Sequence, residues 1–564
     1  MASSFMGLYV QRDGLNLAQK GLDITGNNLA NVKTEGYTRQ RLDLVSAKIS
    51  SSTLGYDNSI FLAGAGVEGQ GVTQTRDALL DDKYRKYSTV LGDLEVKSNV
   101  LSDVEDAIDD IENDEAGFAR ALSEFKAAWQ SFSSSGTDQD DLANVAKNAA
   151  QNAINVIKNF SSRMDSISDD TYSDVETTVT RINTILETCA KLNEQIKASY
   201  VQLNDVYDKG YGFEADINYG PLELKDTMNY LIDELSTYTD ISAVTEADGT
   251  FTIQICGVDA VKNDEYAKMT ISEDTTPTNL GLSITDLKTN AAWRNIRCEC
   301  DGADADLVAE INHAIDEGNF TLAKNLEDKL VEGGVPADYQ RLFPTTEITG
   351  MMTGGTLKGG LDMYNGKGMY ADAGKNAYNG IQYYKATMDA LATSIAEEFN
   401  AIYDGYDFKM FDFRPGYENT AAGLIIADEW QENPLQAVHP AGIDEEDYNY
   451  DELTNVHINK ILSVFEATHL VGKETVPYTF EDFVAHYGNT IGSQLEGVNK
   501  SSESSEIMFN SVSDARDSIM GVSTDEEGVN MLTYQKWYNA MSRMVNALDE
   551  LLDRLINSTG RVGL

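Results

Sequence analysis

Apolar residues recur at heptad spacing near the N-terminus of the chain. A leucine falls at every seventh position, at Leu8, Leu15, Leu22 and Leu29. Gln11, Ala18 and Thr25 lie between them, and the alternating steps of three and four are typical of a seam between packed helices. A glycine precedes each of the first three leucines, at Gly7, Gly14 and Gly21. Because glycine costs a helix interior about 1 kcal/mol relative to alanine, this repetition indicates close approach of a second helix.

A stronger heptad pattern lies at the C-terminal end. Its apolar positions step by three and four through Tyr534, Trp537, Met541, Met544, Leu548, Leu551 and Leu555. Tyr538, Val545 and Leu552 widen the same face, and the acidic run 525–527 is typical of a helix start. A lone helix of this kind is marginal in water. The two ends could cover each other, or pack against other subunits, or form an internal hairpin with no role in assembly.

Helical periodicity also dominates much of the interior. Apolar spacing predicts helices over 78–102, 118–132, 141–167, 172–206 and 380–403. The Ser- and Gly-rich stretch 131–136 predicts one break, and the pair Asp169-Asp170 predicts another.

The pattern changes near Tyr238. Two alternating runs, 241–244 and 251–255, flank Asp248-Gly249, which indicates a β-hairpin. Short Thr- and Ile-rich pieces follow over 266–290, and helical spacing returns over 303–331. We therefore expect a mainly α protein with a β-containing insert, of α+β class. Its expected domains are paired terminal helices (1–60 and 510–564), a mainly helical middle domain (61–237 and 346–509, with a Gly-rich hairpin near 59–75) and a partly β outer domain (238–345).

Charge separates the two ends from the rest. The chain has 564 residues and a formal net charge of −49, which argues against nucleic-acid binding because phosphate backbones would be repelled. Residues 1–42 carry five basic and three acidic side chains, and residues 529–564 carry four and three, so the remainder has a net charge of −52. The near-neutral ends are typical of segments that lie close to other copies, and the acidic middle of a solvated surface.

Several classes of protein and site are disfavoured. No apolar run approaches the roughly 20 residues of a membrane span, so no membrane insertion is expected, and the first residues lack the basic region of a cleaved signal peptide. The four cysteines are too few for a disulfide framework, and Cys298 and Cys300 form the only close pair. Free thiols explain that pair better than a metal site, since too few ligands lie near it.

No motif in the sequence predicts catalysis. Gly64 to Gly69 fits a dinucleotide-binding pattern but lacks the alternating strands and helices that such a site needs, so a Gly-rich hairpin is the better interpretation. Gly354 to Gly359 lacks the ending of a phosphate-binding loop, and the five histidines are dispersed. We therefore assign no catalytic residue, no cofactor-binding residue and no metal ligand.

Two terminal motifs resemble a known family. Residues Asn27 to Gln40, which read Asn-Asn-Leu-Ala-Asn-Val-Lys-Thr-Glu-Gly-Tyr-Thr-Arg-Gln, resemble the N-terminal signature of bacterial flagellar axial proteins, which include rod, hook and hook-associated proteins. Family members often have proline where Glu35 stands, while Gly36 is kept. The segments 521–527, 530–540, 354–362, 395–400 and 118–157 resemble the hook-associated protein 1 family in particular. The resemblance covers roughly 1–235 and 350–564.

The resemblance implies a structural, non-enzymatic subunit of the hook–filament junction, outside the cell and exported without a cleaved signal. Its terminal helices would form an inner tube, stacked as a homo-oligomer against neighbouring subunits. The implied partners are hook protein, the second junction protein (hook-associated protein 3) and an export chaperone at the C-terminal helix. The predicted assembly interface consists of both seams together with Asn28, Asn31, Gly36 and Tyr37. It requires no cofactor.

Three alternatives are compatible with the sequence. The chain could be another axial subunit such as hook protein, although the motif at 534–540 argues against it. The central insert could carry an enzyme, or the chain could be a cytoplasmic coiled-coil protein.

Overall fold

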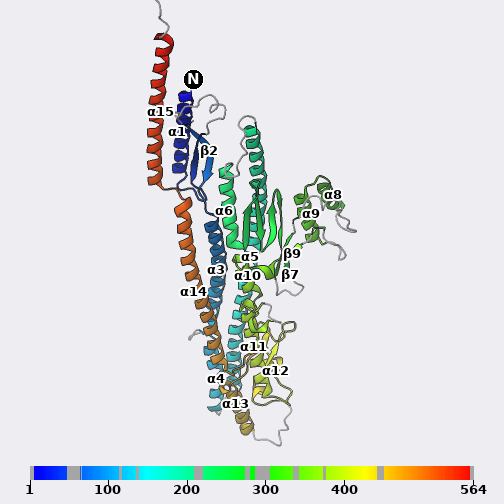
Figure 1. The fold of residues 1–564 in the computed structure, drawn as a ribbon. Helices are drawn as coiled ribbons and strands as arrows, with labels where there is room; N and C mark the ends of the chain where they lie inside the picture. Colours follow the sequence, from blue (N-terminus) through cyan, green and yellow to red (C-terminus); the bar gives the residue numbers. More distant parts are fainter. Residues whose placement is uncertain are drawn as a thin grey trace, which may run out of the picture.

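The protein is an elongated molecule in which the two terminal helices lie side by side at one end (Figure 1). The computed structural model describes residues 6–47, 64, 66–112, 117–134, 139–208, 220–273, 280–285, 287, 305–334, 342–343, 345–371, 376–440 and 450–558. Cys298 and Cys300 lie outside these residues. Most described elements are helices, and the strands form four small antiparallel sheets. The predicted class, mainly α with a β-containing insert, is confirmed.

One end is built from α1 (Met6–Ala30), α15 (Thr524–Ser558) and the two-stranded sheet of β1 (Gln40–Ser46) and β2 (Val67–Gln74). We call these four elements the terminal module. Gln40 pairs with Gln74 at one end of the sheet, and Ser46 pairs with Val67 at the other. The Gly-rich segment 67–74 therefore pairs with β1, a strand that the sequence pattern does not predict, while the run 59–62 lies outside the described residues.

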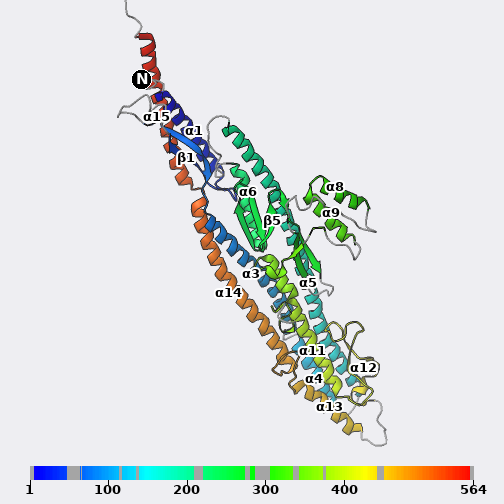
Figure 2. The ribbon, with the colours of Figure 1, turned by 45° about the vertical axis from the view of Figure 1, so that its right-hand side comes forward.

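Two long helices run alongside each other from the terminal module to the opposite end (Figure 2). They are α3 (Ala78–Glu112) and α14 (Phe480–Met520), and we call this pair the shaft. The 70-residue helix α5 (Gln139–Asp208) packs against α3. The predicted break at Asp169-Asp170 is wrong, because α5 continues through it. Both side chains are exposed, so neither has to be desolvated for the helix to continue.

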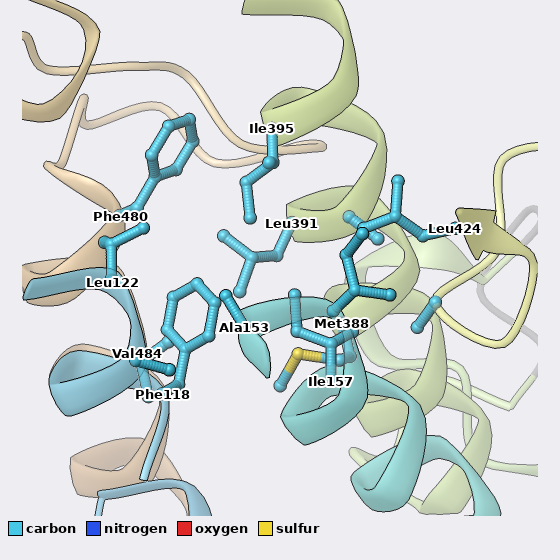
Figure 3. Packing of buried hydrophobic residues seen from close by; sticks show 14 of the residues in the cluster. Phe118, Leu122, Ala153, Ile157, Met388, Leu391, Ile395, Leu424, Phe480 and Val484 are labelled. Carbon is cyan, nitrogen blue, oxygen red and sulfur yellow. The ribbon is translucent and has the colours of Figure 1, made fainter. Parts of the chain in front are cut away.

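The largest hydrophobic core lies at the end remote from the terminal module. It joins α4 (Phe118–Ser134), α5, α11 (Ile381–Ala401), α13 (Tyr450–Glu466) and the start of α14, and Figure 3 shows part of it. The short sheet of β10 (Phe411–Phe413) and β11 (Leu424–Ile426), with α12 (Asp428–Glu432) and the 3-10 turn η3 (Pro434–Ala437), closes one side. The indoles of Trp129 and Trp430 stack at its centre, 6.4 Å apart.

A second core lies between the insert and the long helices. The sheet β3 (Ile241–Thr245), β4 (Phe251–Ile255), β5 (Val258–Lys262) and β6 (Glu265–Tyr266) packs its apolar side chains with those of α5 and α6 (Leu222–Tyr238). The predicted hairpin at Asp248-Gly249 is confirmed, with Gly249 at φ +81°. A second sheet contains β7 (Met269–Glu273), β8 (Leu280–Thr285) and β9 (Thr345–Glu347). Between β8 and β9, α8 (Ala305–Asp316) and α9 (Phe320–Glu332) form a hairpin with its own small core.

Five asparagines on helices, all buried or half-buried, fasten these helices to neighbouring strands or extended chain. In each case the side-chain amide donates to a backbone carbonyl and its oxygen accepts from a backbone N–H of the same residue, as a neighbouring strand would do. These pairs are Asn28 with Gln40, Asn183 with Met269, Asn193 with Phe251, Asn365 with Leu280, and Asn400 with Phe411.

The glycine-rich segment 354–360 opens α10 (Thr356–Asn365), which follows the 3-10 turn η1 (Thr349–Met351) and precedes η2 (Gly368–Tyr370). Gly355 has φ +92° and donates its N–H to the carbonyl of Thr89 at 2.8 Å. A β-carbon on Gly359 would lie 2.7 Å from the carbonyl oxygen of Asp93. These glycines therefore allow α10 to pack closely on α3, which supports a packing role for them rather than phosphate binding.

Candidate assembly interface

The terminal helices α1 and α15 are antiparallel, and the glycines of α1 set their register. A β-carbon on Gly7 would meet Leu548 at 3.6 Å, one on Gly14 would meet Met541 at 3.2 Å, and one on Gly21 would meet the ring of Tyr534 at 2.5 Å. Both rows repeat every seven residues, so three large side chains of α15 lie over three glycines of α1. The close approach indicated by the glycine spacing is present in the structure.

The leucines of the α1 heptad lie beside this contact row. Leu8, Leu15, Leu22 and Leu29 are all half-buried. The buried positions are instead in the glycine row and next to it, at Gln11, Gly14, Ala18, Gly21, Ile24, Thr25 and Asn28. Thr25 is satisfied there because its hydroxyl donates to the carbonyl of Gly21 at 2.8 Å. The other flank of α1 faces β2, where Val10 lies near Gly66 and Leu17 near Gly69.

The predicted α15 seam divides into two groups. Tyr534, Trp537, Met541 and Leu548 are half-buried, as are the flanking Tyr538, Val545 and Leu552. Met544, Leu551 and Leu555 are exposed by 53%, 59% and 63%. Val529, Leu532 and Ile556 are also exposed on this helix. In the single chain, α15 therefore buries one side of its apolar surface against α1 and leaves another side open.

The Asn-rich motif builds the turn that leads from α1 to β1. The hydroxyl of Tyr37 donates to Asn28 Oδ1 at 2.8 Å, and Asn31 Nδ2 donates to the carbonyl of Asn27 at 3.0 Å. Gly36 has φ +74°, a conformation that favours glycine, and a β-carbon there would crowd Tyr230 of α6 at 3.1 Å. Burial, with the charges of Asp226, Glu223 and Glu527, raises the pKa of Tyr37 to about 12. All four predicted turn residues thus have contacts within the chain.

Arg39 connects this turn to the start of α15. Its Nε lies 2.8 Å from Glu527 and its Nη1 lies 2.7 Å from Glu526, while its backbone N–H donates to the carbonyl of Met520 at 2.9 Å. The Glu527 side chain is buried, so this ion pair is largely shielded from water. Both acids lie in the first turn of α15, where negative charge is favoured.

A cluster of buried or half-buried charged residues lies where the terminal module meets the shaft and α6. It consists of Arg76, Arg85, Arg516, Asp81, Asp226 and Asp233, and we call it the charged joint. Arg516 of α14 pairs with Asp81 at 2.6 Å and with Asp233, and its guanidinium lies 4.3 Å from the ring centre of Tyr84. Burial raises the pKa of Asp81, but the hydrogen bond and charge of Arg76, with the charges of Arg516 and Arg85, lower it below its ordinary value overall.

Neither the joint nor the role of Arg39 is predicted by the sequence pattern. Arg39 belongs to the recognised motif, but its two acidic partners are more than 480 positions away. Arg516 is likewise 435 positions from Asp81. Spacing along the chain carries no signal for such contacts.

The described part of the chain contains neither a metal-binding cluster nor a membrane-spanning helix. Its residues contain no group of three or more His, Cys, Asp or Glu side chains placed to hold a metal ion. Among them, too, no helix combines the length and the apolar character needed to cross a bilayer.

Models of three protein families match the chain. Residues 101–297 match "Flagellar hook-associated protein FlgK helical domain", residues 8–38 match "Flagella basal body rod protein", and residues 517–558 match "Flagellar basal body rod FlgEFG protein C-terminal". The last two segments cover most of α1 with the turn after it, and all of α15 with the end of α14.

Known proteins match over nearly the whole length. Flagellar hook-associated protein 1 of Bacillus subtilis is 26% identical over 99% of both chains, and that of Salmonella typhimurium is 21% identical over 96% of this chain and 98% of its own. A solved structure, the flagellar hook junction protein FlgK from Burkholderia pseudomallei, aligns with TM-score 0.40 and 15% identity over 59% of this chain and 47% of that chain. The two sequence matches confirm the resemblance predicted from the sequence, and the chain is similar to flagellar hook-associated protein 1 of these two bacteria along nearly its whole length.

Proposed function

We propose that the chain is a structural adaptor that joins hook to filament in the bacterial flagellum by stacking of its terminal helices. The observation that carries the proposal is the open apolar side of α15, formed by Met544, Leu551 and Leu555. Burying a side chain of this kind stabilises by about 1.5–3 kcal/mol. A protein gains this only if another molecule covers the stripe, so a neighbouring subunit is the natural occupant.

The register of the terminal helices supports the same role. Since α1 already covers Tyr534, Met541 and Leu548 from one side, the pair can act as a preformed unit with one apolar side left for stacking. Asn28, Asn31, Gly36 and Tyr37 would contribute by fixing the turn at the base of this unit. The near-neutral ends reduce repulsion between stacked copies, and the acidic middle would form the outer surface.

The proposed partners follow from this arrangement. Copies of the chain would stack laterally, with hook protein below and the second junction protein (hook-associated protein 3) above. A flagellar export chaperone would cover the C-terminal helix before assembly, because an open apolar stripe invites aggregation. The subunit would work outside the cell after export without a cleaved signal, as a non-enzymatic component with no cofactor.

The proposed role also assigns a place to each domain. The paired terminal helices (1–60 and 510–564) would form the inner tube, 61–237 and 346–509 the middle domain, and 238–345 the outer domain.

Replacing Met544 and Leu551 together with aspartate tests the proposal. Both side chains are more than half exposed, so the monomer should keep its fold, whereas two charges in a stacked apolar contact should abolish filament attachment. Motility on soft agar and electron microscopy of hooks provide the measurement, with secretion of the variant checked in the medium.

The matched control is the double substitution of Asn539 and Asn546 with aspartate, which adds the same charge with the same spacing at exposed polar positions on another side of the same helix. It should leave attachment near the wild-type level. Normal filaments on the Met544/Leu551 variant would show that the open side of α15 has no role in assembly.

A further inference from the structure

Two members of the charged joint, Arg76 and Asp226, contact Thr38, and Asp226 is the one that belongs to α6. The backbone N–H of Thr38, in the turn between α1 and β1, donates to its Oδ2 at 3.2 Å. Its other oxygen, Oδ1, is buried and accepts no hydrogen bond from any residue that the structure describes. The nearest cation is Arg76, whose Nη1 lies 3.9 Å from this oxygen.

Arg76 is engaged mainly elsewhere. Its Nε and Nη2 donate to the two oxygens of Asp81 at 3.0 and 3.1 Å, and its Nη1 donates to the hydroxyl of Thr38 at 3.2 Å. A bidentate pair of this kind is much stronger than an ion pair at 3.9 Å without a hydrogen bond. Asp226 is therefore a desolvated carboxylate whose charge is only partly compensated.

Two further titratable groups, Glu223 and Tyr37, interact with Asp226. Glu223 lies one turn earlier on α6 and repels it, and the hydroxyl of Tyr37 belongs to the adjacent turn. Burial comes first among the effects and raises the pKa of Asp226, while the hydrogen bonds of Thr38 and the charge of Arg76 oppose it and Glu223 adds to it, giving about 6. The burial of Asp226 and the charges around it both disfavour the ionised form of its carboxyl group.

The contact between Thr38 and Asp226 lies where the terminal module meets α6 and the shaft. Three other contacts join the same two parts of the molecule. They are the hydrogen bond from the Gln74 side chain to the carbonyl of Leu222 at 2.9 Å, the bond from the backbone N–H of Arg39 to the carbonyl of Met520, and the packing of Gly36 on Tyr230. Three of these four contacts place the module on α6, and Asp226 is the one whose strength depends on a titratable group. A change in the charge of Asp226 can therefore alter the orientation of the terminal module relative to α6 without unfolding either of them.

We propose that Asp226 locks the terminal module onto α6, and that uptake of one proton by this carboxyl group tightens the lock. In the ionised form, the unsatisfied Oδ1 is best relieved by water, which can enter only when the turn around Thr38 moves away from α6. A proton on Oδ1 removes the charge, while Oδ2 still accepts from the Thr38 N–H. The module is then held in one orientation at mildly acidic pH and samples a wider range at alkaline pH. This lock does not depend on the proposed function.

Stability should follow pH in a defined direction. Because the pKa of Asp226 is raised from 3.8 to about 6, its protonation stabilises the native state fully below pH 4, and this contribution is lost as the pH rises through 6. A difference of roughly two pKa units corresponds to at most about a 100-fold change in the folding equilibrium constant. Denaturant titrations of wild type and Asp226→Asn between pH 4 and 8 should show that the substitution removes this part of the pH dependence.

The lock is tested by single-molecule energy transfer on the full chain. Dyes attached to genetically encoded keto amino acids in place of Lys86 and Asn539, both exposed, report the distance between the shaft and α15 and leave the four cysteines unchanged. The wild type should give a narrow distance distribution at pH 5 and a broader one at pH 8. Asp226→Asn should be narrow at both pH values, since its amide oxygen can still accept from Thr38.

Two further chains complete the test. Asp226→Ala, which cannot accept the bond, should be broad at both pH values, with its fold confirmed by circular dichroism. Glu234 lies on α6, as Asp226 does, but it pairs with Arg181 of α5 and is not part of the charged joint. Glu234→Gln should therefore behave as the wild type. A wild-type distribution that is independent of pH, or an Asp226→Ala distribution as narrow as that of Asp226→Asn, would overturn the proposal. Broad distributions in all four chains at both pH values, as an unfolded module would give, would also overturn it.

Discussion

Alanine at Gly21 should destabilise the pair of terminal helices by about 1–3 kcal/mol, the range measured for overpacked contacts. The added methyl group would lie 2.5 Å from the ring of Tyr534, which is much closer than carbon atoms approach in proteins. A tyrosine ring cannot bend away as a methionine can, so α15 itself has to move. The gain of up to about 1 kcal/mol from replacing glycine in a helix offsets only part of this effect. Amide exchange of α15 peptides in the monomer measures the change.

The same helix provides a graded set of controls. A β-carbon added at Gly26 would have no atom within 4 Å, so Gly26→Ala should stabilise α1 slightly. Gly7→Ala should be nearly neutral, because its neighbour Leu548 lies at an ordinary contact distance of 3.6 Å. Gly14→Ala should fall between Gly7→Ala and Gly21→Ala, since its contact of 3.2 Å is tighter than that of Gly7 but the flexible Met541 can yield. Equal exchange rates in the Gly21 and Gly26 variants would contradict the observed register.

Removing the guanidinium of Arg516 should have the largest effect of any substitution in the charged joint. Arg516→Ala leaves Asp81 and Asp233 with one partner fewer and removes the group that lies over Tyr84. Breaking a buried ion pair by deleting one partner costs about 3–5 kcal/mol, because the remaining charge stays buried. Unfolding by guanidinium chloride, followed by circular dichroism, should show a lower denaturation midpoint than in the wild type. Amide exchange should localise the loss to the ends of α3, α6 and α14 that meet there.

Two comparisons separate charge from packing. Arg181→Ala removes an exposed pair with Glu234 and should cost less than about 1 kcal/mol. Arg516→Met keeps an apolar stem of similar length, so any stability that it recovers relative to alanine reports packing alone. An Arg516→Ala chain as stable as Arg181→Ala would show that the joint does not hold the molecule together.

The sequence correctly predicted features that depend on neighbours along the chain. The helices at both ends, the close contact at the glycine row of α1 and the hairpin at Asp248-Gly249 all follow from local periodicity and backbone preference. The predicted break at Asp169-Asp170 failed because two exposed acids do not interrupt a helix whose apolar face continues on both sides. Strand β1 had no signal because its partner β2 lies more than twenty residues further along the chain.

By itself, then, the sequence determined that both ends are amphipathic helices, that α1 accepts a close neighbour and that the chain resembles flagellar axial proteins. Only the tertiary structure decided which side of α15 that neighbour covers, leaving Met544, Leu551 and Leu555 open while Tyr534, Met541 and Leu548 lie over glycines. Only the fold, likewise, brings Arg76, Arg516 and Asp226 into one joint. The physical reason is that a heptad fixes the period of a helix face but not its rotation toward a partner. A buried ion pair, in addition, depends on distances in space that the spacing of residues along the chain does not encode.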